Sequence, residues 1–145
     1  MITKKGDFKF PQKQRKANQM KSTLPRWIGI YAKNWFLKGF RQGGGQTDDS
    51  SGGWASRKKS ERGNRRGILI QSGKLRNSIE IIKSTFHTII VGSIGLIYAR
   101  VHNEGLRSGR GKGFKMPKRE FIGKSSKLES DIRKRIKKEM DLIFR

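Results

Sequence analysis

Two β-rich stretches, "ILIQSGKLRNSIEI" at 68–81 and "HTIIVGS" at 87–93, decide the fold class of this chain. A Ser-Gly pair in the first stretch marks a turn or a helix start. The chain then leads into a strand that places Ile79 and Ile81 on one face. Because only the short polar segment "KSTF" separates the strand from the β-branched second stretch, the pair predicts an antiparallel hairpin.

Helices are expected on both sides of this hairpin. Residues 26–40, "RWIGIYAKNWFLKGF", carry apolar side chains at helical spacing, and Pro25 suits the first turn of such a helix. After Gly123, Ser126 and Glu129 form the pattern of a capping box at the start of a long amphipathic helix. Its expected apolar face comprises Leu128, Ile132, Ile136, Met140 and either Ile143 or Phe144.

A shorter helix is expected between the hairpin and the C-terminal helix. The segment "GLIYARVHNEG" begins apolar and ends at Gly105, a residue that commonly stops a helix. Ile94, Ile97 and Val101 suit a short buried helix.

The order of these elements predicts an α+β fold, with a small antiparallel β-sheet packed against an N-terminal helix and a long C-terminal amphipathic helix. The 145 residues suit one domain. We expect residues 1–23 to be a basic flexible arm and residues 24–145 to form a single α+β domain. Within it, the Gly-rich segments 41–53 and 106–116 are expected to be mobile loops.

The composition excludes several classes of protein. There is no cysteine, so neither disulfides nor thiolate metal ligands are available. Apolar runs are too short or too polar to span a membrane, and the N-terminus lacks the apolar core of a secretory signal. We therefore expect a soluble protein that is not exported and has no membrane partner.

The charge predicts attraction to polyanions. The chain has 35 Lys and Arg against 11 Asp and Glu, a formal net charge of +24. The charged residues of the strand-rich segment 77–98 are Glu80 and Lys83 alone, so this segment has no net charge. Candidate contacts to DNA or to another partner are the four cations of the glycine-rich loop, Arg107, Arg110, Lys112 and Lys115.

Catalysis has little support in the residues. His102 and Glu104 could form an acid–base pair, but no recognisable nucleophile turn accompanies them, and no second histidine lies at metal-ligand spacing from His102. A histidine in this setting more often hydrogen-bonds its own loop. We therefore predict no enzyme activity, no catalytic or metal site, and no cofactor.

The series "GGW", "ILIQSGKLRNSI", "VGS", "YARVHNEG" and "MPKREFIGKS" resembles the phage virion morphogenesis proteins, also called tail-completion proteins, of Mu-like and P2-like prophages. The matching residues that we expect to be structural or to lie at interfaces are Trp54, Leu69, Gly73, Leu75, Ser78, Gly92, Tyr98, His102, Gly105, Pro117, Arg119, Phe121 and Gly123. Glu120 stands where the family often has proline, and Glu104 where an apolar residue is more usual.

This resemblance implies a structural virion protein that completes the tail or forms the neck ring joining the tail to a DNA-filled head. It implies a homo-oligomeric ring, often a hexamer, that contacts other neck, connector or tail-tube proteins in the virion after assembly in the host cytoplasm. Non-specific contact with genomic DNA in the channel is a further expectation. The alternative is a basic, sequence-independent DNA-binding protein that acts in phage DNA packaging. A small hydrolase that uses His102 and Glu104 ranks last.

Overall fold

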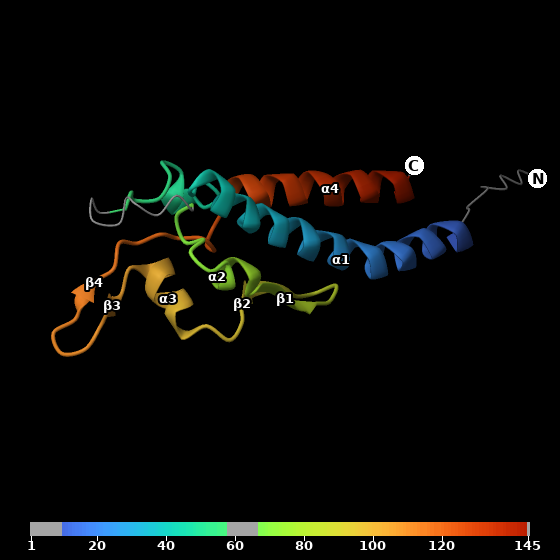
Figure 1. The fold of residues 1–145 in the computed structure, drawn as a ribbon. Helices are drawn as coiled ribbons and strands as arrows, with labels where there is room; N and C mark the ends of the chain where they lie inside the picture. The colour runs from blue at the N-terminus through green and yellow to red at the C-terminus, as the bar shows by residue number, and fades with distance from the viewer. Residues whose placement is uncertain (1–9, 58–66, 145) are drawn as a thin grey trace, which may run out of the picture.

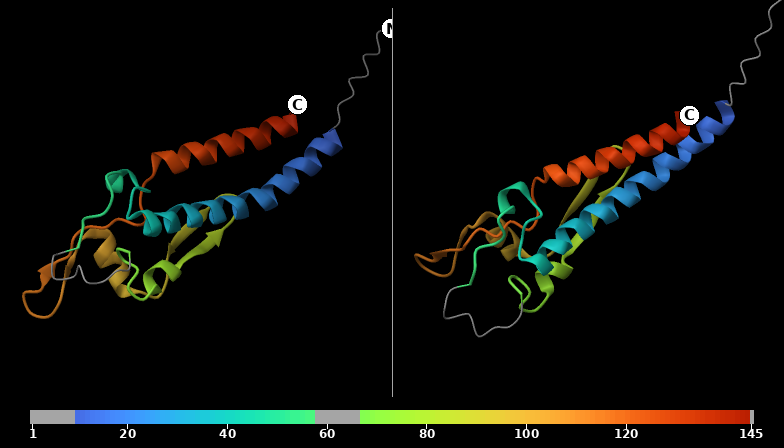
Figure 2. Two further views of the ribbon diagram at one scale, coloured as in Figure 1. Left: turned by 45° about the horizontal axis from the view of Figure 1, so that its top comes forward. Right: turned by 90° about the horizontal axis from the view of Figure 1, so that it is seen from above.

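The computed structural model describes residues 10–57 and 67–144, and it has the predicted α+β architecture (Figure 1). Two long helices, α1 (Phe10–Gln42) and α4 (Ser126–Phe144), lie antiparallel to each other. Helix α1 also packs against a hairpin of β1 (Ile79–Ser84) and β2 (Ile89–Ser93). Figure 2 shows the helices and the hairpin from two further directions. No described helix is long and apolar enough to cross a lipid bilayer.

Helix α1 begins much earlier than predicted. Residues 10–23, which we expected to belong to a flexible arm, are helical, and only residues 1–9 of that arm lie outside the described part of the chain. This stretch is rich in Gln, Lys, Arg, Ala and Met, which lose little side-chain entropy in a helix. Pro25 is therefore inside the helix and buried, rather than in its first turn. The hydroxyl groups of Ser22 and Thr23 donate to the carbonyl of Gln19 in the turn before it.

A ladder of aromatic residues joins α1 to α4. Trp27, Tyr31 and Trp35 follow one another at a spacing of four along α1, and the rings of Trp27 and Tyr31 stack at 4.9 Å. They meet three α4 residues that have the same spacing in reverse order. The guanidinium of Arg135 lies 5.1 Å from the Trp27 ring, the Tyr31 hydroxyl donates to Asp131 Oδ2 at 3.0 Å, and Lys127 Nζ lies 5.6 Å from the Trp35 ring. This reversed spacing fixes the antiparallel register of the two helices.

The predicted hairpin is confirmed. Strands β1 and β2 pair antiparallel, with Ile79 opposite Ser93, and a bulge interrupts the register between Ile81 and Lys83. Ile79 is completely buried. Ile81 points toward α1, because a Cβ added at Gly29 would lie 3.2 Å from its side chain.

Two buried clusters form the core. The first contains Phe40, Trp54, Leu75, Ile79, Ala99 and Phe121. The second contains Ala32 and Phe36 of α1 and Leu128 of α4, and Val91 of β2 packs against both clusters. The core therefore joins both long helices to the hairpin.

The glycine-rich loop 41–53 is packed, contrary to our expectation of a mobile segment. It contains a short 3₁₀ helix, η1 (Asp48–Ser50), and Thr47 is buried. The Thr47 hydroxyl donates to Glu120 Oε2 at 2.9 Å. The carboxylate of Asp48 accepts from the amide and the hydroxyl of Ser126, at 2.9 and 2.8 Å. These bonds tie the loop to the start of α4.

The predicted amphipathic helix α4 is present, but its predicted capping box is not formed. Ser126 is already the first helical residue, and its hydroxyl donates to Asp48. The cap is instead Ser125, whose Oγ accepts from the amide of Leu128 at 3.4 Å. The Asp48 carboxylate places a negative charge at the positive end of the helix dipole, and these bonds lower the pKa of Asp48.

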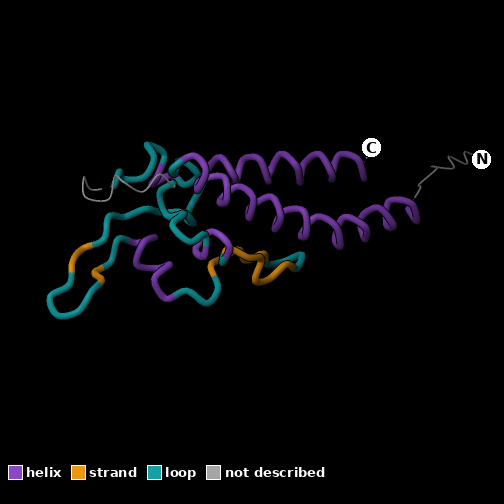
Figure 3. Tube along the Cα trace, in the orientation of Figure 1, coloured by secondary structure: helices purple, strands orange, loops and turns teal. Residues whose placement is uncertain are grey.

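Two short helices and a second hairpin complete the described chain (Figure 3). Helix α2 (Lys74–Asn77) precedes β1, and α3 (Ile97–Glu104) follows β2 and stops at Gly105 as predicted. Burial within and before α3 differs from the prediction. Ile97 is 95% exposed, Ile94 is also exposed, and the buried residue of α3 is Ala99. Residues 106–116, expected to be a mobile loop, contain β3 (Arg107–Ser108) and β4 (Phe114–Lys115), which pair antiparallel.

Candidate functional site

The aromatic and apolar motif residues meet in the first core cluster. Trp54 packs edge-on against Phe40 of α1 at 5.3 Å, and Phe121 lies 5.6 Å from the same ring. The indole Nε1 of Trp54 donates to the carbonyl of Glu120 at 2.9 Å. Leu75 of α2 is buried in this cluster, and Leu69 packs against it with a φ of 61°, which is rare for a residue with a side chain. These residues hold the fold together.

Arg119 is a buried link between three segments. Its Nε donates to the carbonyl of Ala55 at 3.1 Å and its guanidinium reaches the carbonyl of Ser56 at 3.4 Å. Its backbone amide donates to the carbonyl of His102 in α3 at 2.9 Å. Arginine suits this position because its rigid fork satisfies several acceptors at once.

Asn103 is the central polar residue of the motif, and the sequence analysis did not single it out. Its Oδ1 accepts from the amides of Phe121 and Ile122, at 2.9 and 3.1 Å, and its Nδ2 donates to the carbonyl of Ile122 at 2.9 Å. One side chain thus satisfies three main-chain groups of an irregular segment. The signal in the sequence was its place in "YARVHNEG", immediately beside the histidine.

The motif glycines have two different physical roles. Gly73 and Gly105 adopt left-handed conformations, with φ of 74° and 70°, at the ends of helices. Gly92 and Gly123 are crowded instead. A Cβ at Gly92 would lie 2.8 Å from Ile82 Cδ1, and one at Gly123 would collide with the Glu120 carboxylate. Gly105 combines both roles, because its Cβ would lie 3.0 Å from the backbone of Lys118.

The remaining motif residues lie at the periphery of this network. The Ser78 hydroxyl donates to the carbonyl of Leu75 and lies 2.7 Å from the hydroxyl of Ser93. Pro117 is half-buried. Tyr98, which we expected to be structural or to lie at an interface, is 40% exposed, and its ring contacts His102 edge-on at 6.0 Å.

His102 and Glu104 are not brought together as an acid–base pair. Glu104 accepts instead from Arg100 Nε at 2.9 Å, on the exposed side of α3. The Nδ1 atom of His102 is buried and has no hydrogen-bond partner among residues 10–57 and 67–144. Burial, and then the charge of Arg119, lower the pKa of His102. The imidazole is therefore neutral at pH 7. In a separate respect, the described part of the chain holds no group of three side chains that could ligate a metal ion.

The four predicted cationic contacts all lie on the β3–β4 hairpin. Arg107 and Lys115 are directly opposite each other across the two strands, and Arg110 and Lys112 lie in the turn between them. All four are exposed, and none of their side chains forms an ion pair or hydrogen bond with another described residue. Like charges directly opposite in an antiparallel pair are destabilising. The hairpin is thus suited to receive a negatively charged partner.

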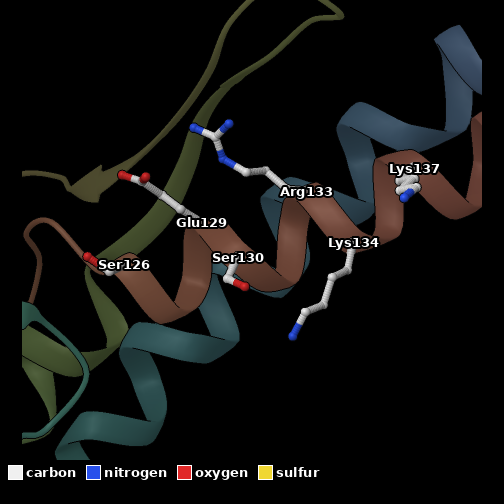
Figure 4. Close-up of a pocket in the computed structure, with 6 residues that line it drawn as sticks. All are labelled: Ser126, Glu129, Ser130, Arg133, Lys134 and Lys137. Atoms are coloured by element: carbon white, nitrogen blue, oxygen red, sulfur yellow. The ribbon is translucent and has the colours of Figure 1, made fainter.

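A surface hollow on α4 has a volume of about 340 Å³. It is lined by Ser126, Glu129, Ser130, Arg133, Lys134 and Lys137. Figure 4 shows Glu129 and Arg133 on one side of the helix and Lys134 on the other. Because these side chains diverge from a single helix, the hollow does not form an enclosed ligand site.

The site therefore consists of a buried structural network and an exposed cationic hairpin. The model of the phage virion morphogenesis family matches residues 43–141, and the chain belongs to this family. The matched residues contain the whole network from Trp54 to Phe121 and both hairpins. No curated protein and no solved structure matches the chain. Family membership indicates a structural role in phage morphogenesis and association with the virion.

Proposed function

We propose that this protein completes the phage tail, or forms the neck ring that joins the tail to the DNA-filled head. The observation that carries the proposal is the family match over residues 43–141, which coincides with the hydrogen-bonded network of the fold. The buried Arg119 and the half-buried Asn103 of that network bond to main-chain atoms. They therefore serve the architecture and leave the surface to carry the function.

The proposed partners are further copies of the chain, arranged as a ring that is expected to be hexameric, and the neighbouring connector or tail-tube proteins. A ring in the neck surrounds the channel through which DNA passes. The wall of this channel must tolerate a polyanion without binding one particular sequence. A net charge of +24 agrees with this requirement, because cations that contact phosphates do not read the base sequence. The proposed location is the head-proximal end of the tail.

The test is negative-stain imaging of a lysate from a phage that lacks this gene. We expect DNA-filled heads and separate tails, with joining restored when the gene is supplied from a plasmid. Intact particles would contradict the proposal. Empty heads would also contradict it and would favour a role in packaging.

A second candidate function is sequence-independent DNA binding during packaging. The observation in its favour is the pairing of Arg107 with Lys115 on an acid-free hairpin. On this hypothesis the purified protein binds unrelated duplexes with equal affinity and a steep salt dependence. The two hypotheses separate in the imaging experiment, because a packaging defect leaves heads empty whereas a joining defect leaves them full.

A further inference from the structure

The outer face of the β1–β2 hairpin carries exposed apolar side chains. Ile79 and Val91 point into the core, so alternation along the strands places Gly92 on the opposite face. Ile82 lies on that face as well. A Cβ atom added to Gly92 would lie only 2.8 Å from the Cδ1 atom of Ile82. Ile90 precedes Gly92 by two residues on the same strand.

Ile94 extends this face beyond the end of β2. Its amide donates to the carbonyl of Ser78 at 2.9 Å, so the strand pairing continues to this residue, two positions after Gly92. The three side chains Ile82, Ile90 and Ile94 are 53%, 42% and 48% exposed, and we call them the outer isoleucine face. Phe86, at the tip of the hairpin, is 45% exposed.

The same hairpin is almost uncharged, unlike the rest of the chain. Within residues 79–93 the formally charged side chains are Glu80 and Lys83, which have opposite signs. Helix α1, by contrast, contains eight Lys or Arg and no Asp or Glu. The register places both charges of the hairpin on the outer face, with Glu80 opposite Gly92 and Lys83 opposite Ile90. The outer isoleucine face therefore has no net charge, whereas a polyanion requires a surface with an excess of cations.

We propose that the outer isoleucine face is the surface on which a second copy of this chain docks. Two copies of a protein with a net charge of +24 repel each other, and the repulsion between their contacting surfaces is least where those surfaces carry no net charge. The hairpin provides such a surface together with the apolar area that drives association. This inference deepens the proposed function and rests on it for the expectation that copies assemble.

Gly92 acquires a specific role in this proposal. Because Gly92 has no side chain, Ile82 can lie over position 92, where its Cδ1 atom would be 2.8 Å from an added Cβ. A side chain at position 92 would push Ile82 away from the strand and leave the face uneven. Gly92 thus keeps the surface of the hairpin low enough to pack against another sheet.

The experiment measures the mass of the purified full-length protein by light scattering after gel filtration, at about 0.5 M salt to screen the net charge. We expect a species heavier than the 16.6 kDa monomer. Ile90→Lys places a charge in the contact and should raise the dissociation constant at least about tenfold, giving the monomer mass. Leu142→Lys makes the same change at an exposed apolar residue of α4 and should leave the assembly intact.

Circular dichroism and thermal unfolding establish whether each variant is folded. If Ile90→Lys does not fold, Ile82→Thr and Ile90→Thr replace it, because threonine retains the β-branched shape that strands favour. A wild-type protein that stays at the monomer mass up to about 100 µM, a range that covers micromolar affinities, overturns the proposal. An assembly that Ile90→Lys and Leu142→Lys affect equally also overturns it.

The imaging of phage particles separates this inference from the proposed function. If the gene deletion leaves heads and tails unjoined but a plasmid carrying Ile90→Lys restores joining, the proposed function stands and the outer isoleucine face is not the contact. If the deletion leaves intact particles, the proposed function fails, whatever the mass of the purified protein.

Discussion

Arg107 and Lys115 lie directly opposite each other across the β3–β4 hairpin, with no acidic side chain of the described residues bonded to either. Such a pair of like charges destabilises an isolated hairpin and favours a bound anion. We predict that Lys115→Glu stabilises the protein, by about 0.2–1 kcal/mol, because it converts the repulsion into attraction. The same change should weaken binding to duplex DNA. It should also reduce the slope of the logarithm of affinity against the logarithm of salt concentration by the amount expected for about one phosphate contact.

Lys112→Glu is the matched control for this substitution. It makes the same change of charge in the same hairpin, but at a residue that is not paired with Arg107. It should weaken DNA binding without raising the melting temperature. Equal melting temperatures for the two variants would show that the cross-strand repulsion has no measurable effect.

Ile79 is the best position at which to test the core. It is completely buried between α1, α2 and the hairpin, so Ile79→Ala should lower the free energy of unfolding by about 2–5 kcal/mol. Ile97→Ala removes the same atoms from a side chain that is 95% exposed, and should change stability by less than about 0.5 kcal/mol. Urea denaturation of both variants measures the difference. Similar losses for the two would contradict the burial of the hairpin.

Local patterns in the sequence predicted the hairpin, the C-terminal helix and the stop of α3 at Gly105, because β-branched runs, amphipathic spacing and a terminal glycine each act within a few residues. The start of α1 could not be predicted in the same way. Residues 10–23 contain few apolar side chains, and their helix continues through Pro25, which is buried in the structure. Tertiary packing overrode the local signal that proline gives.

Contacts between distant segments account for the other errors. Ser126 has the sequence of a capping box, but its hydroxyl bonds to Asp48, which lies in a loop 78 residues earlier. That bond also explains why the loop is packed. The role of Asn103 was equally hidden, because its partners lie 18 and 19 residues away. The residues alone did not reveal which side chain joins these segments.

Asn103 supports the segment 121–122 through three hydrogen bonds, so its removal should be costly. We predict that Asn103→Leu lowers the free energy of unfolding by about 1–3 kcal/mol, because it leaves main-chain groups without partners. Asn103→Asp retains the acceptor for both amides and should be less damaging. Asn34→Leu, at an exposed position of α1, is the control and should have little effect. Thermal unfolding of the three variants ranks them, and an equal loss for Asn103→Leu and Asn34→Leu would contradict the assigned role.

His102 should make the stability depend on pH in a defined window. Burial and the Arg119 charge lower its pKa in the folded state, so below the ordinary value of 6.5 the unfolded chain binds a proton that the folded chain does not. Its stabilising contribution is therefore complete above pH 6.5 and decreases as the pH falls toward the lowered pKa. Asp48 acts in a separate window, because its pKa is lowered from 3.8. We expect His102→Gln to flatten the stability profile just below pH 6.5. A wild-type profile that is already flat there would show that the imidazole does not titrate differently in the two states.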